Sequence, residues 1–241
     1  TGMVMLGVTM LDTRRAEDRG HANHGWLDSY HTFSFGSYQD ARHMGFSNLR
    51  VINDDTVAPG EGFSTHGHSD MEIVSYVLEG GLEHKDSMGN GSVIRPGDVQ
   101  LLSAGTGVTH SEYNHSPADP VHFLQIWLQP NRLGVQPSYE QRHYPLDERQ
   151  GRLVLLVSPD GRDDSISSNQ DALLYGGLLA ANDRQIHRLP TDGRAYVHVA
   201  RGSVAVNDTL LNAGDGISIA GVPEVRFDGL DQAEVLLFDL P

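Results

Sequence analysis

The chain of 241 residues contains no cysteine and only one lysine, Lys85. Without cysteine, disulfide bonds and thiolate metal sites are excluded. Lysine and arginine together number 17 against 32 aspartate and glutamate residues, and the net charge is −15. Proteins that bind nucleic acid directly need clusters of basic side chains to neutralise phosphates. A chain this acidic is therefore not expected to bind nucleic acid.

Long apolar runs are also missing. No stretch of 18 consecutive apolar residues occurs, so neither a transmembrane helix nor a membrane partner is expected. No basic segment is followed by an apolar one, as it would be in a secretory leader. We therefore expect a cytoplasmic protein. An alternative start at Met10 would leave residues 1–9 outside the fold, and they are not used to predict it.

The sequence does contain many short apolar runs, separated by glycine, asparagine, aspartate and proline. This pattern predicts an all-β protein, built as a sandwich or a barrel. No long segment has a convincing 3.6-residue apolar period, and only Ser138–Tyr144 is compatible with a short helix. Strands are expected near residues 49–53, 73–78, 99–102, 121–128, 153–157, 196–199 and 235–238.

Two pairs of side chains carry most of the chemical information: His66 with His68, and His110 with Glu112. Residues i and i+2 of a strand point to the same face, so each pair can direct two ligands at one point. Two neighbouring strands would offer three imidazoles and one carboxylate to a divalent transition metal. This donor set fits non-haem iron, and it also accepts manganese, cobalt, nickel, copper or zinc.

A degenerate internal repeat indicates two similar domains, which we predict at residues 10–135 and 150–241 with a polar linker within 130–150. VSYVLEGGLE and RPGDVQLLSAG in the first half correspond to VHVARGSVAV and NAGDGISIAG in the second. Aligning the glycines of the two halves assigns no imidazole to the ligand positions of the second half, and His187 falls one residue out of register, on the opposite face. The positions equivalent to the four ligands are Arg188, Pro190, Arg226 and Asp228. We therefore predict one metal site, in the N-terminal domain.

Two histidine motifs resemble those of the cupin superfamily: G-x5-H-x-H over Gly60–His68 and G-x2-H-x3-N over Gly107–Asn114. More narrowly, RGHANHGWLDSYHTFSFGSY, MGFSNLRVINDD, HSDMEIVSYVLEG and SAGTGVTHSEYN resemble segments of the pirin family. The resemblance extends from about Arg19 to Trp127 and continues more weakly to the C-terminal VLLFDLP.

The resemblance implies a bicupin, in which two antiparallel β-barrels of the jelly-roll type face each other, with short helical segments and iron in the N-terminal barrel. Many cupins take a carboxylate ligand from the position held here by Ile73, and the adjacent Glu72 is expected to face away from the interior. Pirins take it from the second motif, where this chain has Glu112. The implied metal ligands are His66, His68, His110 and Glu112.

Some pirins, especially bacterial ones, are similar to quercetin 2,3-dioxygenases. The resemblance implies an oxidoreductase that uses Fe(II) and O2 to cleave quercetin-like flavonols, with Glu112 as the base that takes the proton of the 3-hydroxyl. Other pirins bind partner proteins, which leaves open a redox-sensing regulator that docks a protein partner. A scaffold with a coordinatively closed metal is a third alternative. A deep apolar cavity favours the enzyme, and a shallow or plugged cavity favours the regulator. We expect a monomer.

Several other side chains have two interpretations. A structural role is preferred to a pocket-lining one for three histidines: His21, His24 and His31. Ordinary packing is preferred to an apolar pocket entrance for Trp26, Met44 and Phe46. His122 is interpreted as a core histidine with a partner, and Asn114 as either a turn residue or a contact of a metal ligand. No spacing signal assigns a role to His84, His115 and His143.

Overall fold

The computed structural model describes residues 9–241, which form two compact units. The N-terminal unit comprises Arg19–Glu148 and Leu156–Asp171. The C-terminal unit comprises the described residues up to Asp18 together with Arg149–Leu155 and Ala172–Pro241. Residues 1–8 lie outside this description. They belong to the segment of residues 1–9 that was not used to predict the fold. The division of the chain into two domains, at residues 10–135 and 150–241, stays a prediction.

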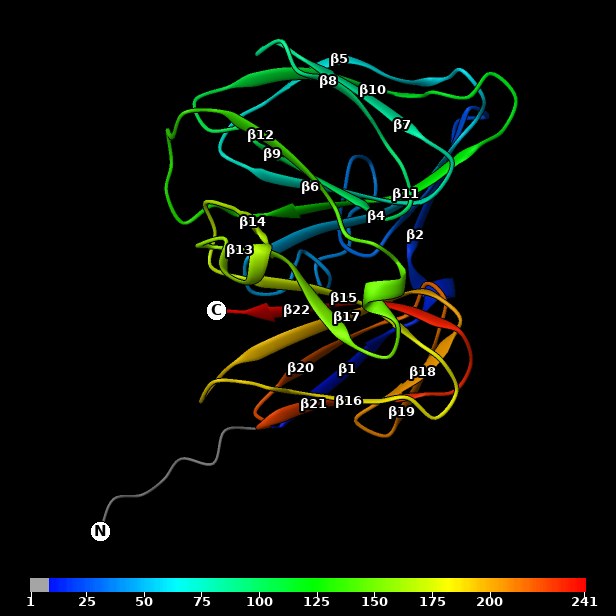
Figure 1. The fold of residues 1–241 in the computed structure, drawn as a ribbon, viewed down its shortest axis with the longest axis vertical. Helices are drawn as coiled ribbons and strands as arrows, with labels where there is room; N and C mark the ends of the chain where they lie inside the picture. The colour runs from blue at the N-terminus through cyan, green and yellow to red at the C-terminus, as the bar shows by residue number, and fades with distance from the viewer. Residues whose placement is uncertain (1–8) are drawn as a thin grey trace. The chain divides into compact units, whose positions relative to one another are not determined.

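The N-terminal unit consists of two antiparallel sheets that share a core (Figure 1). The larger sheet has the order β12 (Ser138–His143), β9 (Asp98–Ser103), β6 (Glu72–Glu79), β11 (Val121–Leu128), β4 (Leu49–Val57), β3 (Leu27–His31) and β2 (Gly20–Asn23). The smaller sheet has the order β5 (Gly62–His68), β10 (Val108–Asn114), β7 (Leu82–Asp86) and β8 (Gly91–Ile94). Their facing sides meet in an apolar cluster of Leu27, Val57, Val77, Leu82, Ile94, Val121 and Phe123.

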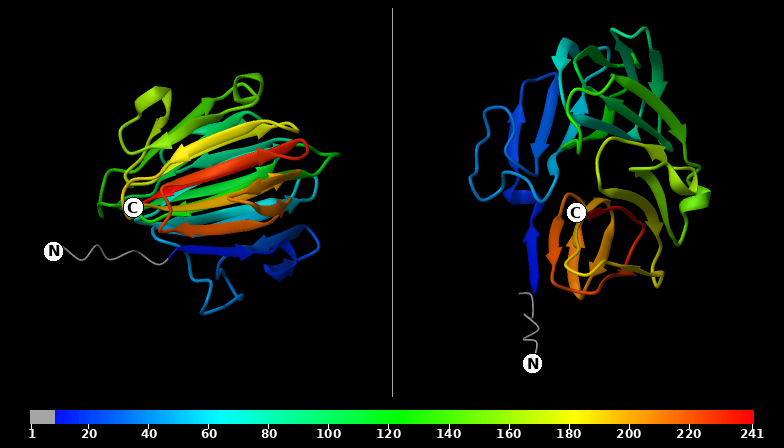
Figure 2. Two further views of the ribbon diagram at one scale, coloured as in Figure 1. Left: turned by 90° about the horizontal axis from the view of Figure 1, so that it is seen from below. Right: turned by 90° about the vertical axis from the view of Figure 1, so that its left-hand side faces the viewer.

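The C-terminal unit repeats this plan. Its larger sheet, whose strands lie side by side in Figure 2, has the order β1 (Met10–Arg14), β20 (Gly216–Ala220), β17 (Arg194–Arg201), β22 (Ala233–Leu240), β15 (Leu173–Leu179) and β13 (Leu153–Ser158). From Leu156 onwards β13 belongs to the N-terminal unit, where it pairs in parallel with β14 (Ile166–Ser167). The smaller sheet has the order β16 (Arg184–Arg188), β21 (Glu224–Gly229), β18 (Ser203–Val206) and β19 (Thr209–Asn212).

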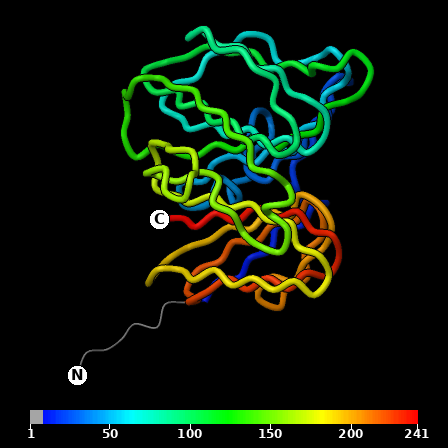
Figure 3. The backbone as a smooth tube through the Cα atoms, in the orientation of Figure 1, coloured from blue at the N-terminus to red at the C-terminus, as the bar shows by residue number. Residues whose placement is uncertain are grey.

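The first strand of the chain completes the C-terminal unit. β1 pairs antiparallel with β20, so residues about 200 positions apart in sequence lie side by side, as the blue and orange segments of Figure 3 show. Three short 3-10 helices complete the described elements: η1 (Ala16–Asp18), η2 (Asp147–Arg149) and η3 (Arg162–Asp164). None of the described helices is long and apolar enough to cross a membrane.

The all-β prediction is confirmed, and each of the seven predicted runs lies within a strand. The barrels, however, are not closed among residues 9–241, because each unit has two separate hydrogen-bonded sheets packed face to face, as in a jelly roll. The predicted helix at Ser138–Tyr144 was wrong. Residues 138–143 form β12, which pairs with β9 at the edge of the larger sheet and so adds a strand within the predicted linker.

Candidate metal centre

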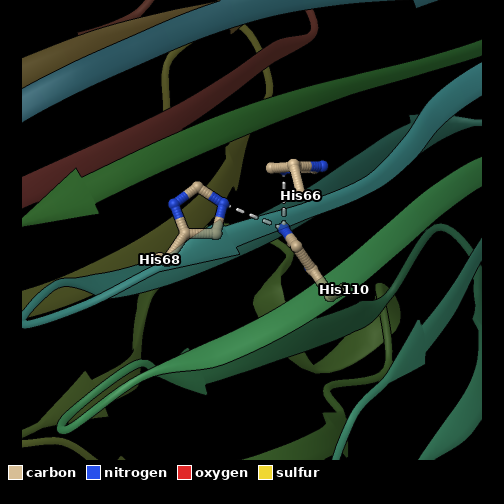
Figure 4. Close-up of side chains that lie close together, drawn as sticks. All are labelled: His66, His68 and His110. Carbon is tan, nitrogen blue, oxygen red and sulfur yellow. Dashed lines mark hydrogen bonds between the residues drawn. The ribbon is translucent and has the colours of Figure 1, made fainter.

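Strands β5 and β10 bring three of the predicted ligands together. They pair antiparallel, with His66 opposite His110 and His68 opposite Val108. Alternate residues of β10 are buried, so His110 points into the unit. The Nε2 atom of His110 lies 3.0 Å from Nε2 of His66 and 3.0 Å from Nε2 of His68 (Figure 4). Three ring nitrogens therefore converge on one point.

The hydrogen bond made by His66 leaves the lone pair of its neutral ring directed at that point. Nδ1 of His66 lies 2.7 Å from the carbonyl oxygen of Ser64, which can only accept, so Nδ1 carries the proton and Nε2 does not. Burial, followed by the neighbouring histidines, lowers the pKa of His68 to about 4. Burial and His66 lower the pKa of His110 to about 3. At neutral pH the rings of His68 and His110 are therefore uncharged.

A β-bulge in β5 changes the register beyond the histidines. His110 pairs with His66, but Glu112 pairs with Phe63, so β5 has one extra residue over this stretch. Glu112 is fully buried and reaches the opposite sheet. Its Oε1 accepts a hydrogen bond from Ser75 of β6 at 3.1 Å, and its Oε2 accepts one from Gln125 of β11 at 2.6 Å. Both carboxylate oxygens are thus held in place by neutral donors.

The four predicted ligands do not form a single group. The potential ligand atoms of His66, His68 and His110 lie within 4.8 Å of one another, whereas Glu112 forms a second such group with His110 and His84. His110 belongs to both groups and joins them. The assignment of all four side chains as ligands of one metal stays a prediction.

His84 is the functional candidate that the sequence did not reveal. Its buried Nε2 lies 2.9 Å from Asp86, its ring stacks on Tyr139, and it pairs with Glu112 across the ladder. The signal was present, since His84 and Asp86 form a third pair at i and i+2, on the strand next to β10. Asp86 also accepts bonds from Asn90 and from the Met88 backbone, which anchors the pair.

A continuous row of polar side chains crosses the larger sheet beneath the site. The row follows the strand register through Gln141, Gln100, Ser75, Gln125, Asn53 and His31. Gln100 donates to Ser75, and Trp127 donates from its indole nitrogen to Gln125 at 3.1 Å. Nδ1 of His31 lies 2.9 Å from Oδ1 of Asn53. The sequence alone did not predict this row of polar side chains.

The row ends in a cavity of about 660 Å³, which is within the size range of ligand sites. The cavity reaches His66, His68 and Glu112 and is lined by five aromatic residues: Trp26, Phe35, Tyr38, Phe63 and Trp127. His21, His24 and His31 also line it, although the sequence favoured a purely structural role for them. A cavity of this volume, open to the predicted ligands and lined by aromatic residues, is not plugged, which favours an enzyme over a regulator.

Asp55 is a buried carboxyl group in the cavity wall. It is only 3% exposed and accepts a hydrogen bond from the Ser29 hydroxyl. Burial raises the pKa of Asp55 to about 7, against the opposing effect of that hydrogen bond. The group is therefore divided between its neutral and charged forms near neutral pH.

The remaining predicted residues have structural partners. Asn114 donates to three backbone oxygens near the end of β10 and accepts from Ser116, which supports the turn interpretation. His122 bonds Asp54 at 2.6 Å and is partly exposed rather than in the core. Glu72 contacts Ser103 and Asn169 and lies in neither ligand group. Trp26 lines the cavity, whereas Met44 is exposed and Phe46 is absent from the lining. His115 bonds Glu83, and His143 bonds Asp98.

The C-terminal unit has no comparable cluster among the described residues. The register assigned from the repeat was, however, wrong by one residue. His187 faces the interior, where it bonds Asp239 at 2.8 Å, and the inward positions of β21 are Val225 and Phe227. Aligning the repeat on glycines assumed equal spacing to the strands, and the one-residue error reversed the inferred faces.

Comparison with known proteins agrees with this geometry. The family model described as Pirin matches residues 12–128, and the one described as Quercetinase C-terminal cupin domain matches residues 155–240. A protein of Escherichia coli named quercetin 2,3-dioxygenase is 47% identical over 232 residues, covering 96% of this chain and 99% of that protein. A pirin-like protein of Caulobacter vibrioides is 40% identical, covering 95% of this chain and 99% of its own length.

Solved structures agree in fold over nearly the whole chain. The crystal structure of YhhW from Escherichia coli superposes with a TM-score of 0.93 at 46% identity, covering 96% of this chain and 98% of that one. A structure of bacterial pirin YhhW in complex with nickel(II) superposes with a TM-score of 0.92 and covers 96% and 99% of the two chains. A relative of this architecture thus binds a divalent metal.

Proposed function

The chain belongs to the pirin family, and on this basis we propose that it is a metal-dependent dioxygenase that cleaves quercetin-like flavonols with O2. One observation carries the proposal: an aromatic-lined cavity of about 660 Å³ opens onto three converging imidazole nitrogens. The 47% identity to a protein named quercetin 2,3-dioxygenase supports the same substrate class.

The residues present fit a divalent metal. Imidazole nitrogens are common ligands of divalent transition metals. The two Nε2 separations measured here are each 3.0 Å. A metal requires uncharged imidazoles, and the lowered pKa values of His68 and His110 favour that form. His66, His68 and His110 would hold the metal, with Glu112 next to them as the carboxylate ligand; Fe(II) is the proposed metal, and nickel in a relative supports divalent character.

When bound, the metal would lower the pKa of the flavonol 3-hydroxyl and supply the oxygen chemistry. Glu112 would take the proton of that hydroxyl. Ser75 and Gln125 donate to Oε1 and Oε2 respectively, and an ionised carboxylate oxygen can accept a further proton beside such a bond. Because both donors come from the opposite sheet, they keep the carboxylate oriented while the proton arrives.

The aromatic walls would orient the substrate and exclude water. Trp127 stands edge-on to the His68 ring at 5.1 Å and to Phe35 at 5.4 Å, and its indole nitrogen is held by Gln125. Trp26 and Phe63 make a second edge-to-face pair at 5.2 Å. A flat ring system can pack between such faces, which contribute apolar area and geometric selectivity.

The test is anaerobic loading with Fe(II), then addition of quercetin and oxygen, with flavonol absorbance and carbon monoxide followed together. We expect one carbon monoxide per flavonol consumed, and loss of both signals in His66→Ala and Glu112→Gln. If iron is bound at one per chain and neither quercetin nor related flavonols are consumed, the proposed activity is wrong.

A further inference from the structure

Two cavity-lining side chains away from the histidine cluster have unused hydrogen-bonding capacity. Asp55 accepts one hydrogen bond, from Ser29, and no other bond links its side chain to the described residues. His31 is 5% exposed and uses Nδ1 for its contact with Asn53. Because the Asn53 oxygen accepts, Nδ1 carries the proton and Nε2 of the neutral ring keeps its lone pair. No described residue bonds that Nε2.

Both groups lie on one wall that leads away from Glu112. Gln125, which donates to Glu112, pairs with Asn53 on the next strand, and Asn53 pairs with His31 on the strand after that. Asp55 lies two residues along from Asn53 and pairs with Ser29. Neighbouring strands are about 4.8 Å apart, so His31 lies roughly two strand spacings from Gln125. A ligand bound at the histidine cluster must therefore extend across about two strand spacings to reach His31.

We infer that Asp55 and His31 form a second recognition point, which accepts hydrogen bonds from hydroxyl groups on the phenyl ring of a flavonol whose 3-oxygen is at the metal. The inference rests on the proposed function and assigns recognition of the phenyl-ring hydroxyls, which quercetin carries, to Asp55 and His31. Asp55 and His31 lie diagonally across neighbouring strands, so the carboxylate and the imidazole can each accept a hydrogen bond from one phenolic hydroxyl.

The physical reason for selectivity is the cost of unmatched acceptors. A buried acceptor that loses water and gains no donor is destabilised, whereas a phenolic hydroxyl restores the bond. Sites built to bond a substrate hydroxyl therefore discriminate against analogues that lack it. Burial raises the pKa of Asp55 to about 7, but both its ionised and neutral forms retain an oxygen that can accept.

The experiment measures binding of two flavonols, one with a 3′,4′-dihydroxyphenyl ring and one with an unsubstituted phenyl ring, to the metal-loaded protein without oxygen. Asp55→Ala and His31→Phe each remove one acceptor, and phenylalanine keeps the ring that contacts Phe35. Asp54→Asn is the matched control, because Asp54 lies on the other face of β4, where it contacts Arg19 and His122.

We expect each acceptor variant to raise the Kd of the dihydroxy ligand about tenfold and to leave the Kd of the unsubstituted ligand within about twofold. The control should change neither. Asp55→Asn, which keeps the side-chain shape, should show the same selectivity with a smaller shift and covers the case in which Asp55→Ala does not fold. Equal weakening of both ligands, no weakening, or no binding of either flavonol to the parent protein overturns the inference. Selective binding without turnover would instead count against the proposed dioxygenase activity alone.

Discussion

The two units have the same two-sheet plan, but their inward-facing side chains differ in polarity. In the C-terminal unit the space between the sheets is filled by 14 buried apolar residues, including Val225 and Phe227 of β21. In the N-terminal unit the corresponding small sheet carries His110 and Glu112, and the facing sheet carries a polar row. The hydrogen-bonded framework therefore does not determine chemistry. The side chains on the inward faces do.

The difference has an energetic basis. Buried polar groups are tolerated when they bond one another, and Glu112 is matched by Ser75 and Gln125. Nε2 of His110 lies 3.0 Å from Nε2 of both His66 and His68, and a metal would satisfy all three nitrogens at once. The interior of the C-terminal unit is filled by apolar side chains, so we expect it to provide stability rather than reactivity.

The largest contrast comes from deleting one histidine in each unit. His110→Ala should abolish iron binding and reduce flavonol turnover to background, because His110 contacts both other histidines. His187→Ala in the C-terminal unit should leave one iron per chain and nearly full turnover. Metal analysis with the carbon monoxide assay measures both. Equal losses in the two variants would contradict a single centre in the N-terminal unit.

Glu112→Gln distinguishes the role of Glu112 in metal binding from its role as the base that accepts the substrate proton. The amide keeps the size of the side chain but removes the base, so turnover should fall about 10²- to 10⁴-fold while much of the iron remains bound. The comparison needs kcat and a metal-binding titration on the same sample. Full turnover in this variant would remove Glu112 from the proposed mechanism.

Phe227→Ala tests the apolar unit. Phe227 is fully buried in the cluster of the C-terminal unit, and truncating such a ring costs about 3–5 kcal/mol of unfolding free energy. Iron stoichiometry at a temperature where the variant is folded should not change. Urea denaturation measures the free energy of unfolding, and metal analysis measures the iron stoichiometry. A stable variant that has lost its iron would mean that the two interiors are functionally coupled.

The pH dependence of stability provides the smallest effect. The pKa of Asp55 is raised to about 7, so the folded state binds more protons than the unfolded state, and stability falls as pH rises from about 4 to about 7. The lowered pKa values of His68 and His110 act in the opposite direction, with stability lost as pH falls below about 6.5.

Asp55→Asn removes only the first effect. As pH rises from about 4 to about 7, the free energy of unfolding of the metal-free variant should rise relative to that of the parent protein by up to about 4 kcal/mol. The reason is that the parent protein loses this stability when Asp55, whose pKa is about three units higher in the folded state, ionises. Urea denaturation at several pH values gives the difference. Parallel pH profiles for the two proteins would mean that the pKa of Asp55 is ordinary.

Much of the fold followed from local patterns. Runs such as Val121–Leu128 have the length and composition of strands, and β11 has those limits. Ser138–Tyr144 was predicted to be helical because its polar residues lack a strand-like apolar pattern, and pairing of residues 138–143 with β9 makes the segment a strand. The two sheets per unit, rather than a closed barrel, depend on long-range hydrogen bonds that no local pattern specifies.

The histidine cluster was predictable because i and i+2 positions on paired strands must share a face, and His66, His68 and His110 do meet. His84 was missed although its i, i+2 spacing from Asp86 is visible in the sequence, because its position beside Glu112 comes from strand pairing, 28 residues away. The inward position of His187 was missed because the spacing of the repeat shifted by one residue. Asp55 lacks any local signal, since its significance comes from burial in the cavity wall.

We propose that one metal is held in the N-terminal unit by the converging imidazoles of His66, His68 and His110. This can be measured by iron-edge X-ray absorption on protein loaded anaerobically with Fe(II), with iron and protein quantified in the same sample. We expect one iron per chain with three imidazole ligands and oxygen ligands in the remaining positions. Fewer than three imidazoles, or a second iron of equal affinity, would contradict it.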